Sequence, residues 1–371
     1  MHLGKRQYGS YEREKDFYNA FNESVEIALR EKVDAFVVSG DLFDTPVPYH
    51  GMEPIEVALR GFRKLKEAGI EVIVIPGDHD APKKVGKPSI LFVREFGGAK
   101  VLVGEDAIRG IEVKGVKFYG IPAFNPYRSS EREQVKKLMK ILAKKADKKS
   151  VLVMHVGICD ILPFSCIEME ELPKGFGYYA MGHVHKSYHK YYSGSPLVYP
   201  GSLEVVSKDE IVDINNKGPV LVDASDDFSF QKIRIKVRPQ FIVFVRGSGL
   251  KALSEVDKQI AQIPPRSVIH LEVSEEAKPF LEAIVRKVKE KRDPLILRIN
   301  VITKKKKVDE PKKSVPKGVG ILEALKEIYG EKLGERIYKL VEAGMVSKDE
   351  AYKELIELFE SGLWSRARRA S

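Results

Sequence analysis

The stretch Val-Asp-Ala-Phe-Val-Val-Ser-Gly-Asp-Leu-Phe-Asp, residues 33–44, is an apolar strand followed by a turn with two carboxylates. Three other apolar runs end in similar turns: Val72–Ile75 at Gly77-Asp78-His79-Asp80, Val151–Met154 at His155, and Tyr178–Met181 at Gly182-His183-Val184-His185. In a parallel α/β sheet the carboxyl ends of the strands share one edge, and ligands bind there. The four turns therefore predict one site that collects these carboxylates and imidazoles.

Each of these motifs also has an ordinary explanation when it is taken alone. A strand that ends in Gly-Asp is a common turn, and a single histidine is more often a surface or core residue than a ligand. Here, however, the two Gly-Asp turns and the histidines gather at strand ends within one segment of the chain. That coincidence favours a functional site over a set of unrelated turns.

Composition limits the class of protein. With 371 residues, 43% of them hydrophobic, the chain is long enough for about two or three domains. No apolar stretch approaches the ~20 residues of a membrane span, and the amino terminus is too polar for a signal peptide, so we expect a cytoplasmic protein without a membrane partner. The formal charge of +10 suggests a polyanionic partner.

The two cysteines, Cys159 and Cys166, are a separate question. Their spacing matches no common zinc or redox motif. We therefore expect both to be reduced residues without a special function.

Strands and helices alternate in the first part of the chain, which predicts an α/β fold. Apolar residues at helical spacing predict a helix over Glu12–Lys32 before the first strand, and another over Glu53–Ala68 before the second. A third predicted helix, Glu131–Ala146, carries five lysines. A solvated helix face explains these lysines better than a nucleic-acid contact does.

The rest of the chain divides into three parts. Alternating strand and helix patterns over 231–303 predict a small α/β domain. Residues 304–318 are rich in lysine and contain two prolines, which is typical of a linker. Residues 319–371 contain three helical segments with too little apolar content for a stable core of their own. We expect this tail to dock on a partner, with packing against the main body as the alternative.

The ligand types at the predicted site indicate a metal. Aspartate and imidazole without thiolate suit divalent ions such as Mn²⁺, with Zn²⁺ or Fe²⁺ as alternatives. The ligands are too many for one ion, so we predict a two-metal centre. A metal pair activates a bridging water and clamps both oxygens of an in-line phosphoryl displacement. The predicted reaction is hydrolysis of a phosphoester.

The order of these motifs resembles the signature of calcineurin-like metallophosphoesterases. Within that family the chain is similar to archaeal double-strand-break repair nucleases of the SbcD type, the meiotic recombination eleven family. The similar stretches are Asp41–Phe43, His155–Ile158, Glu171–Pro173, Tyr178–Lys186 and Tyr192–Glu204. The resemblance implies a β-sandwich nuclease core flanked by helices over 1–230, a DNA-capping domain over 231–303 and a helical ATPase-binding tail over 319–371.

The resemblance also implies a role for each candidate site residue. Asp41 would bridge two metal ions. The other ligands would divide between the ions, with His2 and His185 on one and Asp78, His155 and His183 on the other. His79 would contact the scissile phosphate and act as a general acid toward the leaving oxygen. The alternative for His79 is a structural role in the turn.

Two features depart from the family's pattern. The family has Gly-Asn-His-Asp where this chain has Asp78, so a neutral ligand becomes a carboxylate that is expected to tighten the ion and lower its Lewis acidity. The family also opens with an apolar strand that ends in Asp-x-His, whereas here His2 directly follows Met1. We therefore expect the natural chain to start upstream of Met1, and an ion held by His2 without that aspartate to bind weakly.

Three functions follow as hypotheses. The resemblance implies a Mn²⁺-dependent nuclease with 3′ to 5′ exonuclease action on duplex DNA and endonuclease action on single strands, which forms a homodimer and binds a coiled-coil ABC-type ATPase. A rival hypothesis is a metallophosphatase that acts on a small phosphoester or a phosphoprotein, since the same metals would serve it. A third is a catalytically impaired subunit that only bridges DNA and the ATPase. The additional domain, the basic linker and the tail favour the nuclease.

Overall fold

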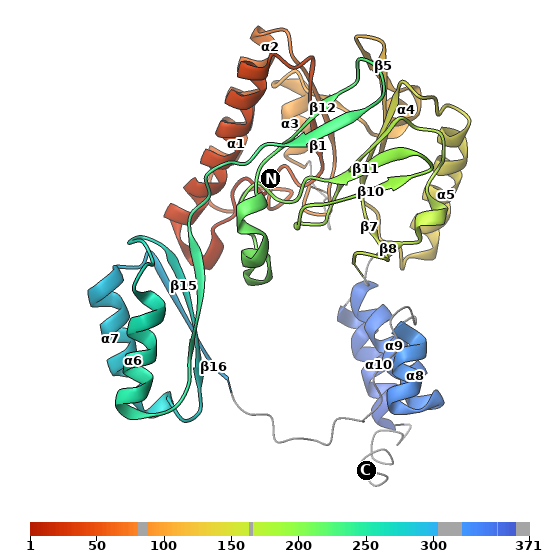
Figure 1. Cartoon of the computed structure of the whole chain (residues 1–371). Coiled ribbons are helices and arrows are strands. Elements are labelled where there is room, and N and C mark those ends of the chain that lie inside the picture. The colour runs from red at the N-terminus through yellow and green to blue at the C-terminus, as the bar shows by residue number, and fades with distance from the viewer. Residues whose placement is uncertain (81–87, 163–165, 303–320, 347, 361–371) are drawn as a thin grey trace. The chain divides into compact units, whose positions relative to one another are not determined.

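The structure is a computed structural model, and it describes residues 1–80, 88–162, 166–302, 321–346 and 348–360 (Figure 1). The chain forms two compact units. The larger unit contains the described residues of Met1–Phe124, Val135–Gly157 and Glu170–Thr303. The smaller unit contains those of Asn125–Gln134, Ile158–Met169 and Lys304–Ser371. The predicted linker over 304–318 lies outside the described residues.

The first sheet of the larger unit is parallel, in the order β1-β2-β3. Its strands are β1 (Ala35–Ser39), β2 (Glu71–Ile75) and β3 (Lys100–Val101). Helices α1 (Tyr11–Glu31) and α2 (Glu53–Glu67) precede β1 and β2, close to their predicted bounds. Phe62 of α2 contacts Phe21 of α1 and Phe36 of β1 edge to face, so an apolar layer forms between these helices and the sheet.

The second sheet has the order β10-β11-β9-β6-β5-β4, with parallel strands inside and antiparallel strands at both edges. The strands are β4 (Ile111–Val113), β5 (Val116–Ile121), β6 (Ser150–His155), β9 (Tyr178–Gly182), β10 (Tyr188–Tyr192) and β11 (Ser195–Tyr199). Every residue of β6 is buried, as expected for the centre of a covered sheet.

The two sheets pack face to face. Ile73 and Ile75 of β2 share a core with Val151 and Val153 of β6. This arrangement confirms the predicted α/β class with a β-sandwich flanked by helices. It also corrects one expectation, because the four polar turns do not lie on the edge of one sheet. Two of them end strands of the first sheet and two end strands of the second. Apolar runs that are buried on both faces look alike in either sheet, so the pattern did not separate them.

The remaining elements of the first 232 residues are short. They are η1 (Gln7–Gly9), α3 (Ile90–Glu95), α4 (Gly104–Arg109), α5 (Ser129–Ala143), β7 (Gly157–Ile158), β8 (Cys166–Ile167), η2 (Met169–Glu171), η3 (Lys208–Asn216), β12 (Val220–Asp223) and β13 (Ser229–Lys232). Helix α5 lies near its predicted range, whereas most of the others have too few residues for a periodic signal.

The expectation that the cysteines are reduced is wrong in this structure. Cys159 and Cys166 form a disulfide with their Cα atoms 5.1 Å apart. Strands β7 and β8 form a two-stranded sheet, and the N–H of Cys159 donates to the carbonyl of Ile167. The pairing of β7 with β8 brings the two cysteine side chains together. The spacing of the cysteines in the sequence did not reveal this contact.

The predicted small α/β domain has a parallel sheet of β14 (Gln240–Val245), β15 (Val268–Ser274) and β16 (Ile296–Ile302). Helices α6 (Gly249–Ile260) and α7 (Leu281–Arg292) lie along the same face of the sheet, and the 3₁₀ turn η4 (Lys278–Phe280) precedes α7 (Figure 1). The first strand of this sheet begins at Gln240, directly after Pro239, which has no N–H for a sheet hydrogen bond.

The described residues of the tail form three helices, as predicted: α8 (Ile321–Tyr329), α9 (Glu331–Val346) and α10 (Lys348–Glu360). Arg336 of α9 contacts Glu354 and Glu357 of α10. None of the helices that the structure describes combines the length and the apolar character needed to cross a bilayer.

We expect Phe62→Ala to lower the free energy of unfolding by about 3–5 kcal/mol, because it leaves a cavity between α1, α2 and β1. Phe96→Ala is the matched control, since this phenylalanine is 64% exposed and should change stability by less than ~0.5 kcal/mol. Urea unfolding of both variants measures the difference. Equal losses would contradict the packing described for Phe62.

Candidate metal centre

Asp41 directly follows the end of β1. The chain turns there through two left-handed residues, Gly40 with φ +90° and Asp41 with φ +52°. A Cβ atom on Gly40 would lie 2.1 Å from Nδ1 of His155, so glycine is the residue that fits this close approach. The turn thereby brings the buried carboxylate of Asp41 next to the end of β6.

Asp80 holds the turn after β1 against the turn after β2. Its buried carboxylate accepts hydrogen bonds from the main-chain N–H groups of Leu42, Phe43 and Gly77, at 3.2, 2.9 and 2.9 Å. The N–H of His79 donates to Oδ1 of Asp41 at 2.9 Å. Burial, with the nearby Asp41 carboxylate, raises the pKa of Asp80 to about 6. Asp80 belongs to the predicted motif, but its scaffolding role was not foreseen.

One cluster of candidate ligands joins the turns after β2, β6 and β9. His155 Nε2 lies 3.2 Å from Oδ2 of Asp41 and 3.4 Å from Oδ2 of Asp78, and His183 Nδ1 lies 2.6 Å from the same Asp78 oxygen. Asp78, His155 and His183 form a group able to hold a cation. The carbonyl of Ser39 accepts from Nδ1 of His155 at 2.7 Å, which leaves Nε2 directed at the carboxylates.

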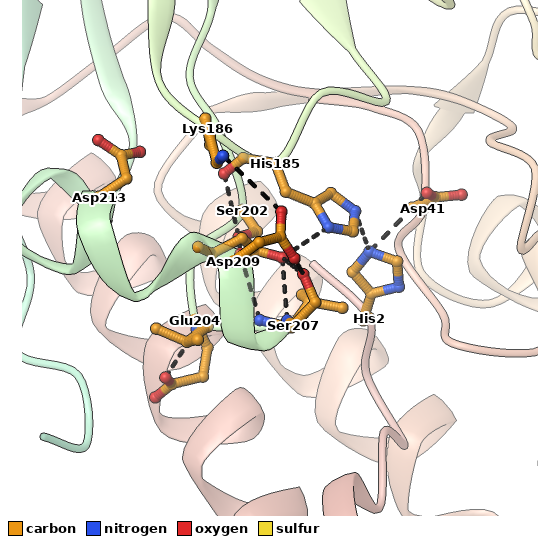
Figure 2. Close-up of polar contacts among 12 residues, drawn as sticks. His2, Asp41, His185, Lys186, Ser202, Glu204, Ser207, Asp209 and Asp213 are labelled. Carbon is orange, nitrogen blue, oxygen red and sulfur yellow. Dashed lines mark hydrogen bonds and ion pairs between the residues drawn. The ribbon is translucent and has the colours of Figure 1, made fainter. Parts of the chain in front are cut away.

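A second cluster contains His2, Asp41 and His185. The amino-terminal segment with His2 lies alongside the turn after β1. The N–H of His2 donates to the carbonyl of Asp41, and Leu3 forms a parallel β-bridge with Phe43. His2 Nε2 lies 3.1 Å from Nε2 of His185 and 3.8 Å from Oδ2 of Asp41. Figure 2 shows the imidazole of His2 between the imidazole of His185 and the carboxylate of Asp41. The same Asp41 oxygen therefore faces both clusters.

The spacing of these atoms fits metal ligands. Two ligand atoms that each lie ~2.1 Å from one ion are roughly 3.0–4.2 Å apart, depending on the angle at the ion. The contacts between 3.1 and 3.8 Å fall in this range. Nε2 of His155 is buried without a hydrogen-bond partner in the described part of the chain, as expected for a nitrogen that binds a cation. Only the 2.6 Å contact of His183 must widen to admit an ion.

The electrostatics of the clusters favour a cation. Burial alone would raise the pKa of Asp41, but the imidazole of His155 outweighs it and holds that pKa below its usual range. Burial also opposes the charge on His155, yet Asp41 and Asp78 raise the pKa of this imidazole to about 10. Burial lowers the pKa of His2 to about 3, so this imidazole is a neutral ligand at pH 7. The carboxylates thus stabilise positive charge between the clusters.

His79 lies at the open side of the centre, with 44% of its side chain exposed. Its Nδ1 lies 2.7 Å from the carbonyl oxygen of Asp44, and its ring is edge to face with His2. With Nδ1 bonded to a carbonyl, Nε2 is the nitrogen available to a substrate. His2, Asp44 and His79 also form a group able to hold a cation, so a ligand role for His79 is an alternative to an acid role.

The structure brings all seven predicted site residues together, whereas their metal and catalytic roles stay predictions. Three further residues contribute without having been predicted as site residues. Asp44 belongs to the first predicted turn but was given no role there, and it lies 3.2 Å from His2 Nδ1. Glu210 and Lys217, beyond the second sheet, support His185. Ser207-x-x-Glu210 is a capping-box signature that marks a helix start in the sequence, but it does not reveal the contact with His185.

Comparison with known proteins shows which proteins this chain is similar to. The calcineurin-like phosphoesterase family matches residues 1–187, which contain every predicted site residue. The chain is 36% identical over 304 residues to the DNA double-strand break repair protein Mre11 of Saccharolobus solfataricus, covering 79% of this chain and 75% of that protein. It is 29% identical over 368 residues to the Mre11 protein of Methanocaldococcus jannaschii, covering 96% and 95% of the two chains. The Mre11 protein of Thermoplasma acidophilum is 32% identical over 324 residues, or 81% of this chain and 85% of that protein.

Removal of the shared carboxylate should impair ion binding. We expect Mn²⁺ to raise the melting temperature of the native chain and a chelator to reverse that rise. Replacement of a residue that only hydrogen-bonds to a metal ligand costs ~10–100-fold in metal affinity. Because Asp41 is itself a candidate ligand, Asp41→Asn should lower Mn²⁺ affinity by more than about 100-fold. Asp106→Asn, an exposed carboxylate on α4, is the control. An unchanged Mn²⁺ affinity in Asp41→Asn, measured by calorimetry, would contradict the site.

Proposed function

The chain belongs to the calcineurin-like phosphoesterase family, and within it to the archaeal Mre11 double-strand-break repair proteins, and we propose that it is a two-metal nuclease that hydrolyses phosphodiesters of DNA. Its family makes it a metal-dependent phosphodiesterase. The observation that carries the proposal is the carboxylate of Asp41, whose Oδ2 lies 3.8 Å from Nε2 of His2 in one cluster and 3.2 Å from Nε2 of His155 in the other. Such a shared oxygen is the feature that a metal pair requires.

In this proposal Asp41 would supply a ligand to each of two Mn²⁺ ions. His2 and His185 would be the other ligands of one ion, and Asp78, His155 and His183 would be those of the other. When bound, the pair supplies an activated water and clamps both oxygens of the displacement. Other residues of the chain hold the candidate ligand atoms in place. The main-chain carbonyl of Ser39 orients His155, and the side chain of Asp80 fixes the loops that carry Asp41 and Asp78.

His79 is proposed to act on the leaving group. Its exposed imidazole projects from the turn beside both clusters, and the carbonyl of Asp44 holds its Nδ1. Nε2 can then contact a non-bridging phosphate oxygen and donate a proton to the leaving oxygen. The exposed position supports this role, because a substrate must reach the acid.

DNA is proposed as the substrate on three grounds. The relatives at 29–37% identity carry the name of a DNA double-strand break repair protein, and the match extends beyond the family core into the later part of the chain. The chain has a formal charge of +10. A small α/β domain follows the core, and we propose that residues 231–303 cap the DNA. A small phosphoester or a phosphoprotein would not need that domain.

The partners of this chain are part of the same proposal. We propose that residues 319–371 bind a coiled-coil ABC-type ATPase and that the nuclease core forms a homodimer. The described part of the tail forms three helices with few apolar residues between them. Because so small a core is rarely stable alone, this supports docking on another protein. A catalytically impaired bridging subunit is the outcome that remains if the chain binds DNA and the ATPase but does not cleave.

We expect His79→Ala to reduce Mn²⁺-dependent degradation of end-labelled duplex DNA by about 10²–10⁴-fold, the usual contribution of a general acid, while Mn²⁺ affinity stays unchanged. His50→Ala, in the turn region before α2, is the control histidine. Fast hydrolysis of a mononucleotide beside intact DNA would reject the nuclease in favour of a phosphatase. Loss of Mn²⁺ binding in His79→Ala would instead make His79 a ligand.

Asp78→Asn tests the additional carboxylate. A neutral amide leaves less negative charge beside His155 and His183, so Mn²⁺ affinity should fall on the order of tenfold. The ion then keeps more Lewis acidity, and turnover at saturating Mn²⁺ should rise. Calorimetry and the duplex assay measure the two effects. Tighter Mn²⁺ binding by the amide, or slower turnover at saturation, would contradict this account of Asp78.

A further inference from the structure

His185 is held by a buried network on the side away from the metal centre. Its Nδ1 lies 2.9 Å from Oε1 of Glu210, a residue that is 1% exposed. Its carbonyl oxygen accepts from the N–H of Ser202 at 3.0 Å and from Nζ of Lys217 at 3.0 Å. The residue is therefore fixed at its ring and at its main chain by groups that come from the segment after the second sheet.

The carboxylate of Glu210 has more partners than a helix cap needs. Oε1 accepts from the N–H of Ser207, as in an ordinary capping box, and in addition accepts from the hydroxyl of Ser207 and faces His185. Oε2 accepts from Lys217, from the hydroxyl of Ser202 and from the N–H of Val206. In Figure 2 a dashed line joins the ring of His185 to this network, which includes Ser202 and Ser207. The short helix η3 thus begins where it supports a candidate ligand.

Lys217 balances the charge of this network. Its ammonium group is fully buried and donates to Oε2 of Glu210 at 2.6 Å, to Oγ of Ser202 at 2.6 Å and to the carbonyl of His185. These contacts use all three of its N–H bonds. A buried ion pair is costly to form, and a hydrophobic pair of similar volume often replaces it without loss of stability. Packing alone therefore does not require Glu210 and Lys217 here.

The contact with Glu210 determines which nitrogen of His185 is free. An ionised carboxylate only accepts, so Nδ1 must carry the hydrogen. The lone pair of Nε2 then points to the opposite side of the ring, where Nε2 of His2 lies 3.1 Å away. Two ring nitrogens that face each other at this distance suit a shared cation. Histidine ligands in metal sites commonly donate their other ring N–H to such a carboxylate.

We propose that Glu210 is a positioning residue for His185, which it holds with Nε2 directed at the ion shared with His2, while Lys217 and Ser202 keep Glu210 in place. The inference rests on the proposed metal centre and adds the residues that orient one of its candidate ligands. Glu210 does not touch the ion or the substrate. Its effect on metal binding is exerted entirely through the imidazole of His185.

The first test is Mn²⁺ affinity by calorimetry on the full chain. We expect E210Q to bind the His185-side ion about 10–100-fold more weakly, the range for loss of an outer-layer partner. E204Q is the matched control, because Glu204 is also 1% exposed but pairs with Arg13 and not with His185. If the native chain binds no Mn²⁺, the proposed function fails. If it binds Mn²⁺ and E210Q binds equally well, this inference fails and the function stands.

A double-mutant cycle separates positioning from a general structural role. In the H185Q background, adding E210Q should cause no further loss of Mn²⁺ affinity, because the residue through which Glu210 acts is absent. An additive loss would overturn the proposal. If E210Q does not fold, the pair E210Q/K217M removes both buried charges together and carries the same expectation.

A spectroscopic measurement gives a readout independent of metal loading. In the chelated native protein, nitrogen–proton correlation spectra of the imidazoles should show the hydrogen of His185 on Nδ1. In E210Q/K217M the ring should populate both tautomers. An unchanged single tautomer in that variant would show that something other than Glu210 orients His185.

Discussion

The structure of the site depends on one buried carboxylate. Asp80 accepts three main-chain hydrogen bonds, two from the turn after β1 and one from the turn after β2. Hydrogen bonds to an ionised acceptor are stronger than neutral ones, so this contact locks the two loops together. As a result Oδ1 of Asp41 binds the N–H of His79, and Oδ2 of the same group is left to face the imidazoles. Asp80, which is not itself a candidate ligand, thereby sets the positions of candidate ligands.

The sandwich then closes the site from the other side. The second sheet brings His155 to the turn of Asp41, and the hydrogen bond from its Nδ1 to the carbonyl of Ser39 joins the two sheets at this point. The approach is so close that Gly40 and Gly182 have no room for a Cβ atom. Close packing of backbone allows candidate ligand atoms from four separate turns to meet within a few ångströms, and it buries the carboxylates of Asp41 and Asp80, whereas Asp78 stays 42% exposed.

The charged residues of the centre fall into two groups, one at the candidate ligands and one behind His185. Asp41 and Asp78 stabilise positive charge between the clusters, and burial keeps His2 neutral. Behind His185, Glu210 and Lys217 form a pair that adds no net charge. Burial alone would raise the pKa of Glu210, but His185 and Lys217 hold it below its usual range, so the carboxylate stays ionised. The centre thus combines a cation-attracting interior with a neutral support.

The sequence by itself determined the main helices and strands and most residues of the candidate site. Asp41, His155 and His185 were predicted because apolar runs of strand length end at them, and this is a local signal. Tertiary structure alone decided that the turns come from two facing sheets, since strands buried on both faces have the same apolar pattern in either sheet. It alone decided that Cys159 and Cys166 are bonded and that Glu210 reaches His185. The disulfide depends on the pairing of β7 with β8, and the contact of Glu210 with His185 joins residues 25 positions apart, so neither follows from a sequence motif.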